Sequence, residues 1–358
     1  MKYTRLLFLS SLVVSLGACS SQAPSEHVPS ESLEVSSSST SFTYSEKLSL
    51  SSFEVKDKDG NKIDNDNLTI EGYDAYNNKE QKVKFIDNNS GDYGYYSLTL
   101  TPLSSFKVLL ISNSHGEDVM RYSAELIQSA GITNYRFVNL YMAGAQIGTH
   151  LTNANSDFDG YQFQDYRGGE PVIERDKTIE YALKADDWDF IIMQQLSALS
   201  RTGNFVKDMD ALIDYCYQNC SNKNVKFLYN MPFSYADMGG DTTLERFWDS
   251  SPLKMYENIA KVTKENVATD KKIEAIIPTG TTAQNAASKL GDNNIHRDSL
   301  HMNDLGRFII AHAFVAKISG VSVSSLTYQG SFSDGNKSIA IKSATSAIEN
   351  PYEVTAIS

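Results

Sequence analysis

The chain has 358 residues, of which 41% are hydrophobic, so it is long enough for two folded units and apolar enough for a core of ordinary size. Acidic residues outnumber basic ones by 44 to 32, which gives a formal net charge of -12. Because no excess of Lys and Arg is present to neutralise phosphates, the composition argues against nucleic acid as a partner.

Residues 1–18 predict a secretory signal peptide. Lys2 and Arg5 form a positive start, and the apolar run Leu6–Leu16 that follows is too short to span a bilayer. The run ends in Leu-Gly-Ala-Cys, which resembles the lipobox of bacterial lipoproteins. The resemblance implies cleavage before Cys19 and a lipid on its thiol. We therefore expect an extracytoplasmic protein that is anchored to the bacterial cell membrane without spanning it.

Two segments of different character follow. Residues 19–41 are rich in Ser and Glu and lack aromatic side chains, which predicts a disordered tether. Residues 42–103 alternate apolar and polar side chains in runs such as QKVKFID and YYSLTLTP, separated by turn signals. This pattern predicts a small antiparallel β sandwich. The segment resembles bacterial immunoglobulin-like modules, which implies a spacer or an adhesion unit.

From residue 104 to 325, continuous apolar runs alternate with segments of helical period, which predicts a doubly wound α/β domain. The expected buried parallel strands are 106–112, 135–141, 189–193, 225–231 and 272–278. The expected helices are 118–130, 205–219, 253–267 and 303–318. Active sites of such sheets form at the carboxyl ends of the strands. Residues 326–358 are expected to be a C-terminal tail.

Ser114 follows the first predicted strand of this domain, in the run Ser-Asn-Ser-His-Gly, and precedes a helix. A Ser at such a junction exposes its hydroxyl and has its N–H at the positive end of the helix dipole, which suits a nucleophile with a base nearby. The position is equally typical of a helix cap, so it does not by itself identify a nucleophile.

Asp298 and His301 stand together just before the last predicted helix of the domain. Three residues apart on one turn, the two side chains can face the same cleft. His301 would then take the proton of a serine, and Asp298 would orient the imidazole and stabilise its charged form. Without a serine beside it, the same pair would fit a surface turn with a helix cap.

A Ser after the first strand together with an Asp-x-x-His before the last helix resembles the SGNH/GDSL hydrolases, over residues 106–318. Ser-Asn-Ser at 112–114 stands where that superfamily has Gly-Asp-Ser, and RDSLHMNDLGRFIIAHAF resembles its last block. The resemblance implies a flavodoxin-like three-layer α/β/α fold with a five-stranded parallel sheet. It also implies that Ser114 is the nucleophile, with His301 and Asp298 as its catalytic partners.

Two further blocks of that superfamily supply the oxyanion hole. Gly144 follows the second predicted strand and matches the Gly whose backbone N–H is one donor. The third block usually ends in Gly-x-Asn-Asp, but here Met-Gln-Gln at 193–195 follows the strand. This resembles the branch that contains sialate and xylan acetylesterases. A Gln amide can donate the same hydrogen bond from one methylene further out, and we favour Gln195 over Gln194.

The resemblance implies a surface serine esterase that hydrolyses O-acyl esters, above all O-acetyl esters on carbohydrate, through an acyl-enzyme. No cofactor is expected, because the sequence has neither a His-Glu-x-x-His metal motif nor a phosphate-binding loop. The alternatives are a lipase-like or thioesterase-like hydrolase, an inactive relative that binds glycan or protein, and a solute-binding lipoprotein of a transporter, which would need two similar α/β lobes where the sequence predicts one. Candidates for the wall of a sugar site lie in a long connection after the second strand: Tyr141, Tyr161, Phe163 and Tyr166.

The remaining cysteines and histidines are expected to be structural or peripheral. Cys216 and Cys220 lie four apart in a predicted helix and are expected to be small buried hydrophobes. His150 and His296 are expected to be exposed or to face the substrate, and His312 to be packed inside.

Overall fold

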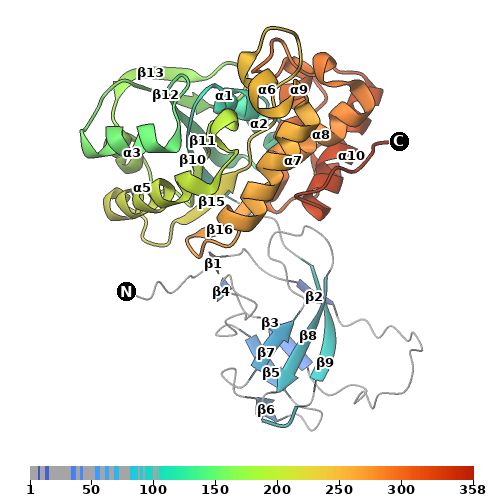
Figure 1. Cartoon of the computed structure of the whole chain (residues 1–358). Helices are drawn as coiled ribbons and strands as arrows, with labels where there is room; N and C mark the ends of the chain where they lie inside the picture. Colours follow the sequence, from blue (N-terminus) through green and yellow to red (C-terminus); the bar gives the residue numbers. More distant parts are fainter. Residues whose placement is uncertain are drawn as a thin grey trace. The chain divides into compact units, whose positions relative to one another are not determined.

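The computed structural model describes residues 105–358 throughout, and before them only Leu103 and short stretches of chain (Figure 1). Cys19 and most of the predicted signal peptide and tether lie outside the described residues. The chain divides into two compact units, one of residues 1–104 with 319–322 and one of residues 105–318 with 323–358. The described stretches before 103 are 7–8, 13–15, 34–37, 41–42, 53–56, 61–63, 68–71, 81–87, 89–91 and 93–99.

The first unit contains short strands that pair antiparallel. One sheet has the order β2-β9-β8-β7, a second has the order β3-β5-β6, and β1 pairs with β4. Strands β5 to β9 lie within 42–103, where antiparallel strands were expected, and the immunoglobulin-like assignment stays a prediction. Strands β1 to β3 lie in the segments expected as signal peptide and tether. Their bounds are β1 Leu7–Phe8, β2 Val13–Ser15, β3 Glu34–Ser37, β4 Ser41–Phe42, β5 Phe53–Lys56, β6 Lys62–Ile63, β7 Leu68–Glu71, β8 Gln81–Asp87 and β9 Tyr93–Thr99.

The second unit is built on a sheet with the strand order β13-β12-β11-β10-β14-β15-β16. All five predicted strands occur in it and pair in parallel, and in chain order they are arranged 2-1-3-4-5, which is the flavodoxin-like order. They are β10 Ser105–Ser112, β11 Asn134–Tyr141, β14 Phe190–Met193, β15 Lys226–Asn230 and β16 Ile273–Ile277.

The expectation of a five-stranded, purely parallel sheet was wrong in one respect. The segment expected as a long connection folds into β12 (Tyr161–Tyr166) and β13 (Val172–Lys177), which pair antiparallel, so the sheet is mixed and has seven strands. The two strands cover the edge of β11, whose backbone groups would otherwise lack partners on that side. Tyr161 and Phe163 consequently lie in the core, each with at most 1% of its surface exposed.

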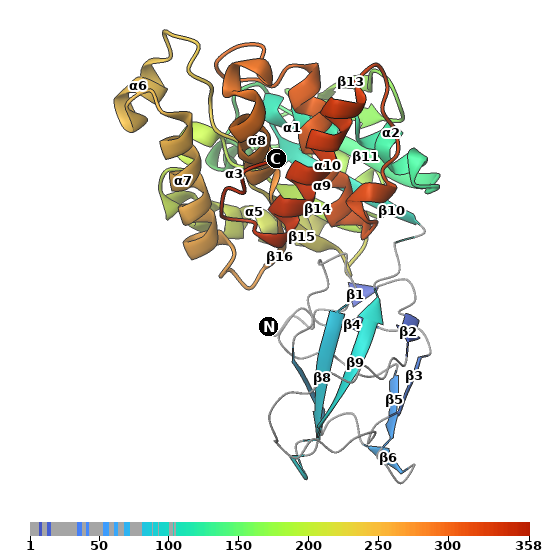
Figure 2. The ribbon, with the colours of Figure 1, turned by 90° about the vertical axis from the view of Figure 1, so that its right-hand side faces the viewer.

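Helices cover both faces of this sheet. Side chains of a strand alternate between the faces, so Leu109 and Ile111 of β10 meet α3, α4, α5 and α7 on one face. On the opposite face Phe137 of β11 meets Phe314 of α9, with ring centroids 6.2 Å apart. Figure 2 shows α9 and α10 nearest the viewer. The helices are α1 Ser114–Met120, α2 Ser123–Ser129, α3 Ile147–Asn155, α4 Ile179–Lys184, α5 Val206–Asn219, α6 Thr242–Trp248, α7 Pro252–Val262, α8 Thr279–Leu290, α9 Asp304–Ser319 and α10 Asp334–Glu349.

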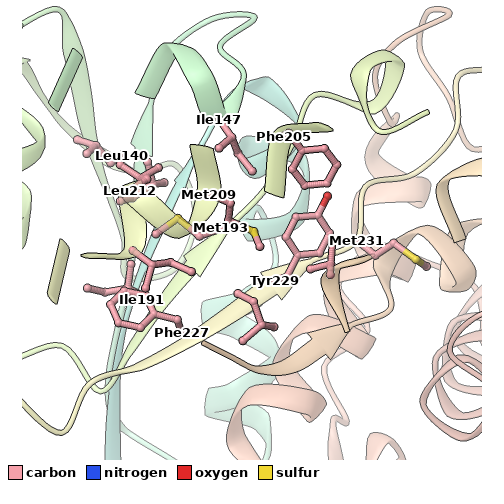
Figure 3. Close-up of a cluster of buried hydrophobic side chains, with 14 of the residues drawn as sticks. Leu140, Ile147, Ile191, Met193, Phe205, Met209, Leu212, Phe227, Tyr229 and Met231 are labelled. Atoms are coloured by element: carbon pink, nitrogen blue, oxygen red, sulfur yellow. The ribbon is translucent and has the colours of Figure 1, made fainter. Parts of the chain in front are cut away.

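The core beneath α3 and α5 is closely packed and mostly aliphatic. Figure 3 shows Ile191, Met193 and Phe227 of the strands beside Met209 and Leu212 of α5. The labelled side chains come from strands β11, β14 and β15, from helices α3 and α5, and from the segments beside them, and the first and last are nearly a hundred positions apart. Because interiors of this kind have little freedom to shift, the sheet gives the strand ends rigid positions. None of the helices in the described part of the chain is long and apolar enough to cross a membrane.

The C-terminal tail expected over 326–358 is instead part of the fold. Ser333 caps α10 by accepting a hydrogen bond from Asn336 N, and the helix then buries Ala340, Ala344 and Ala347 against the molecule. Asn285 of α8 donates to Ser343 O at 3.2 Å, which joins the two helices. The sequence suggests only one short helix in this stretch, because the buried side chains of the 16-residue α10 are small and give a weak apolar signal.

Candidate active site

Ser114 is the first residue of α1, directly beyond the carboxyl end of the central strand β10. Asn113 forms the N-cap of the helix, and its Oδ1 accepts a hydrogen bond from His115 N at 3.0 Å. Asn is a favoured residue at this position because its short side chain reaches the first free N–H groups of a helix. The cap leaves Ser114 partly exposed at the point where the parallel strand order reverses, which is where α/β sheets bind ligands.

The turn before Ser114 is tightly packed, and Gly116 makes it possible. A Cβ at Gly116 would lie only 1.9 Å from Ser112 Oγ and 2.8 Å from Asn139 Oδ1. Ser112 Oγ instead donates to Asn139 Oδ1 at 3.1 Å. Ser112 stands where the SGNH/GDSL hydrolases have Gly. Its side chain fits because Gly116 of α1 has no side chain to collide with it.

The structure brings Ser114, His301 and Asp298 together. His301 Nε2 lies 2.9 Å from Ser114 Oγ, and His301 Nδ1 lies 2.9 and 3.0 Å from the two carboxylate oxygens of Asp298. With its Nδ1–H donated to Asp298, the neutral imidazole turns the lone pair of Nε2 toward the hydroxyl. This is the geometry of a nucleophile, a base and an orienting carboxylate.

Asp298 also organises the backbone of its own turn. Its Oδ1 accepts from Leu300 N at 2.8 Å and from His301 N at 2.9 Å. Partial burial on its own would raise the pKa of Asp298, but the hydrogen bonds from Leu300 and His301 outweigh this effect and hold the pKa below its usual value. The carboxylate is therefore ionised when the imidazole becomes charged.

His115 lies beneath this turn. Its Nδ1 is 3.1 Å from Ser197 Oγ, and its ring lies edge-on to that of His301, with ring centroids 5.9 Å apart. The side chain is 2% exposed, and burial lowers its pKa to about 4. At neutral pH His115 is uncharged and has a structural place next to the nucleophile.

The two sequence candidates for a side-chain oxyanion donor differ in their surroundings. Gln194 is fully buried: its Nε2 donates to Asn113 Oδ1 at 3.4 Å, and its Oε1 accepts from Asn230 Nδ2 at 2.6 Å. Gln195 Oε1 accepts from Leu196 N at 2.8 Å and from Ile147 N at 3.1 Å. The oxygen of Gln195 is thereby fixed, and its Nε2 is the end of the amide that can serve as a donor.

Gly144 lies in the exposed loop between β11 and α3 with a φ of +64°, a backbone conformation that favours glycine. Asn113 Nδ2 donates to Ala145 O at 2.8 Å, so the cap residue of the nucleophile helix also holds this loop. Gln195 holds the start of α3 just beyond it. The loop that carries Gly144 is therefore tied to both neighbouring strand ends.

A chain of polar side chains along the carboxyl ends of the strands escaped the sequence analysis. Asn113 after β10, Gln194 after β14, Asn230 at the end of β15 and Thr279 after β16 are hydrogen-bonded in succession. Each of the four is at most 1% exposed. In the sequence, each of these residues is a polar side chain at the end of an apolar run. That they contact one another can be recognised only once the order of the strands in the sheet is known.

The expected aromatic wall is corrected by the structure. Tyr161, Phe163 and Tyr166 are buried in β12, each at most 3% exposed, and only Tyr141 is partly exposed. Glu117, one turn after Ser114, accepts from Gln164 Nε2 at 2.7 Å. Burial raises the pKa of Glu117. The side chains near the nucleophile on this flank are therefore mainly polar.

Fold and site together define an α/β protein with a Ser-His-Asp arrangement at the carboxyl ends of its parallel strands. The chain belongs to the family described as "Domain of unknown function (DUF4886)", whose profile matches residues 107–347. Among curated proteins, none matches the chain.

A crystal structure of a DUF4886 family protein from Bacteroides uniformis is 28% identical, with a TM-score of 0.66, and the match covers 71% of this chain and 98% of that one. An acetyl xylan esterase from Geobacillus stearothermophilus is 12% identical, with a TM-score of 0.38 and coverage of 61% and 98%. A carbohydrate acetylesterase from Sinorhizobium meliloti is 14% identical, with a TM-score of 0.37 and coverage of 60% and 98%.

Proposed function

We propose that the second unit is a serine esterase of the SGNH kind, which hydrolyses O-acyl esters through an acyl-enzyme on Ser114. The observation that carries the proposal is the position of His301, 2.9 Å from Ser114 Oγ on one side and 2.9 Å from Asp298 on the other. A serine hydroxyl is a weak nucleophile unless a base removes its proton, and this contact supplies the base.

The reaction proceeds in two halves. Ser114 Oγ attacks the ester carbonyl carbon while His301 Nε2 takes the hydroxyl proton, and the intermediate then expels the alcohol, which His301 protonates. Water, deprotonated by the same imidazole, next attacks the acyl-enzyme and releases the acid. The backbone N–H groups of Ser114 and Gly144 and the amide of Gln195 are the donors we assign to the oxyanion.

The substrate we propose is an O-acylated carbohydrate, with acetate as the acyl group. Glu117 and Tyr141, which are both partly exposed, support this assignment, because hydroxyl-rich leaving groups require hydrogen-bond partners beside the scissile bond. We further propose that a lipid on Cys19 anchors the enzyme to the extracytoplasmic face of the cell membrane.

Two assays test the proposal. A fluorophosphonate probe should label the wild-type chain and fail to label Ser114→Ala, whereas Ser156→Ala, at an exposed serine of the same unit, should be labelled normally. A panel of acetylated glycans should release acetate, with kcat lowered by about 10⁴-fold or more in Ser114→Ala. Absence of labelling together with tight glycan binding would instead favour an inactive, glycan-binding relative.

A further inference from the structure

We propose that Asp118 is a positioning residue: its buried carboxylate holds the segment 297–302 against α1 and so sets the contact between His301 and Ser114. The inference rests on the proposed function, because it assigns a role in building that site. It is carried by hydrogen bonds that connect residues 179 to 189 positions apart.

The carboxylate of Asp118 has no exposed surface and receives three hydrogen bonds. Its Oδ1 accepts from Arg297 Nη1 at 2.8 Å and from Arg307 Nε at 2.7 Å. Its Oδ2 accepts from the backbone N–H of Met302 at 2.9 Å. A buried carboxylate needs such partners to remain ionised, and here every one of them belongs to the segment that carries His301 or to the helix that follows it.

Arg297 completes the attachment from the other side. Arg297 Nη1, which donates to Asp118, also donates to Met302 O. Met302 is therefore held at its N–H by Asp118 and at its carbonyl by Arg297. The Arg297 N–H donates in turn to His301 O at 3.0 Å. The two ends of the 297–302 segment are thus joined to each other and to α1.

Ser114 and Asp118 are four residues apart in α1 and therefore lie one above the other on the same side of the helix. Their partners, His301 and Met302, are adjacent. The contact between Ser114 and His301 and the contact between Asp118 and Met302 are consequently neighbouring cross-links between the same two segments. The contact between Ser114 and His301 is one partly exposed hydrogen bond, and the Asp298 side chain that supports it is half exposed. Asp118, by contrast, is fully buried and receives three hydrogen bonds. We infer that the cross-link through Asp118 fixes the geometry of the contact between Ser114 and His301.

The test replaces Asp118 by Asn, which keeps the size of the side chain but loses its charge. We expect kcat to fall by about 10²-fold, as for a misplaced catalytic group, with KM nearly unchanged and with a matching fall in the rate of fluorophosphonate labelling. The control is Asp165→Asn, which also removes the charge of a buried carboxylate between two arginines, Arg136 and Arg167, but on β12, where it pairs with Val138 in the middle of β11. Equal losses of kcat at equal losses of thermal stability in the two variants would overturn the proposal.

A milder variant covers the case in which Asp118→Asn does not fold. Arg307→Lys keeps the positive charge but loses the Nε donor, and it should also lower kcat, by a smaller factor. An unchanged kcat would count against the proposal.

A crystal structure of the folded variant separates this inference from the esterase proposal. If the wild-type chain cleaves no ester, the esterase proposal fails, and a Ser114–His301 separation beyond hydrogen-bond range in the variant still supports the positioning role. An unchanged separation contradicts it.

Discussion

At the scale of single residues, the amide of Gln195 performs two tasks that substitutions can separate. Its oxygen holds Ile147 N and Leu196 N, and we assign its nitrogen to the oxyanion. Gln195→Glu keeps an oxygen for both backbone groups but removes the donor and adds a negative charge beside the developing oxyanion. We expect kcat to fall by about 10²–10³-fold. The unfolding midpoint should fall as well, because Gln195 is only 2% exposed and the new charge is buried.

The comparison for Gln195→Glu is Gln194→Glu. Gln194 donates to Asn113 and accepts from Asn230 inside the protein, so this change also buries a new charge and lowers stability, but it removes no donor that we assign to the oxyanion. Its effect on kcat should therefore be much smaller than that of Gln195→Glu. Urea unfolding and steady-state kinetics of both variants decide the assignment. If Gln194→Glu abolishes turnover at unchanged stability while Gln195→Glu leaves turnover intact, the assignment to Gln195 is wrong.

The sequence predicted which residues meet at the triad but not what holds them there. Ser114, Asp298 and His301 were predicted because each stands at a strand or helix boundary in a recognisable order. Asp118 and Asn230 carry no such mark: an Asp in the first turns of a helix and an Asn at the end of a strand are common for local reasons. Their partners lie far away in sequence, and only the fold identifies them.

At the scale of elements, Thr279 joins the start of α8 to the end of β15. Its Oγ1 lies 2.9 Å from Asn230 Oδ1 and 2.7 Å from Met231 O. Thr279→Val keeps the shape of the side chain and leaves a buried acceptor without its donor, which should cost about 1–3 kcal/mol of unfolding free energy. Thr282→Val is the control, since its hydroxyl bonds only to Pro278 O in its own helix. Equal effects in urea unfolding would contradict the link between the elements.

Helix α10 should be required for the second unit to fold stably. A chain that ends before Asp334 would uncover the face of α8 on which Ala340 and Ala344 pack and would leave Asn285 without Ser343 O. We expect a lower thermal midpoint and an increase in the binding of a hydrophobic dye. A truncated chain with an unchanged midpoint would restore the original expectation of a tail.

The elements that were predicted and those that were missed differ in how they bury apolar surface. The five parallel strands are continuous apolar runs, and these identify buried strands at once. Strand β13 has no buried residue, and α10 buries small ones, so neither gives a strong periodic signal. Strand β12 buries five of its six residues, but these include the polar side chains of Gln164 and Asp165, so its sequence does not form a continuous apolar run.

At the scale of the whole molecule, buried histidines make stability depend on pH. Contrary to the expectation of exposure, His150 and His296 are buried, as are His115 and His312, each at most 4% exposed. Burial lowers the pKa of His115 and His312 to about 4 and that of His150 to about 3, from 6.5. The unfolded chain therefore binds more protons than the folded one between these values, and stability falls as the pH drops from 6.5 toward 4.

Urea unfolding at a series of pH values measures this effect, and His312→Asn isolates one contribution. The variant should lose less stability than the wild type over the same interval, because one of the groups that takes up a proton on unfolding is gone. Asp210 acts in the opposite sense, since burial raises its pKa to about 6, and burial also raises the pKa of Glu117, Asp189 and Asp292. The difference between variant and wild type is therefore the decisive quantity. A His312→Asn variant that loses as much stability as the wild type between pH 6.5 and 4 would contradict the assignment of His312 as neutral.

The contact between Ser114 and His301 also has a consequence for the order in which the protein is made. A ribosome releases the nucleophile early, but the base is 187 residues further along and α9 and α10 come later still. Domains fold largely as units once enough chain has emerged. A chain that stops before His301 therefore carries the serine without the imidazole, and the proposed hydrolytic activity cannot arise until the residues around His301 have been made and have folded against α1.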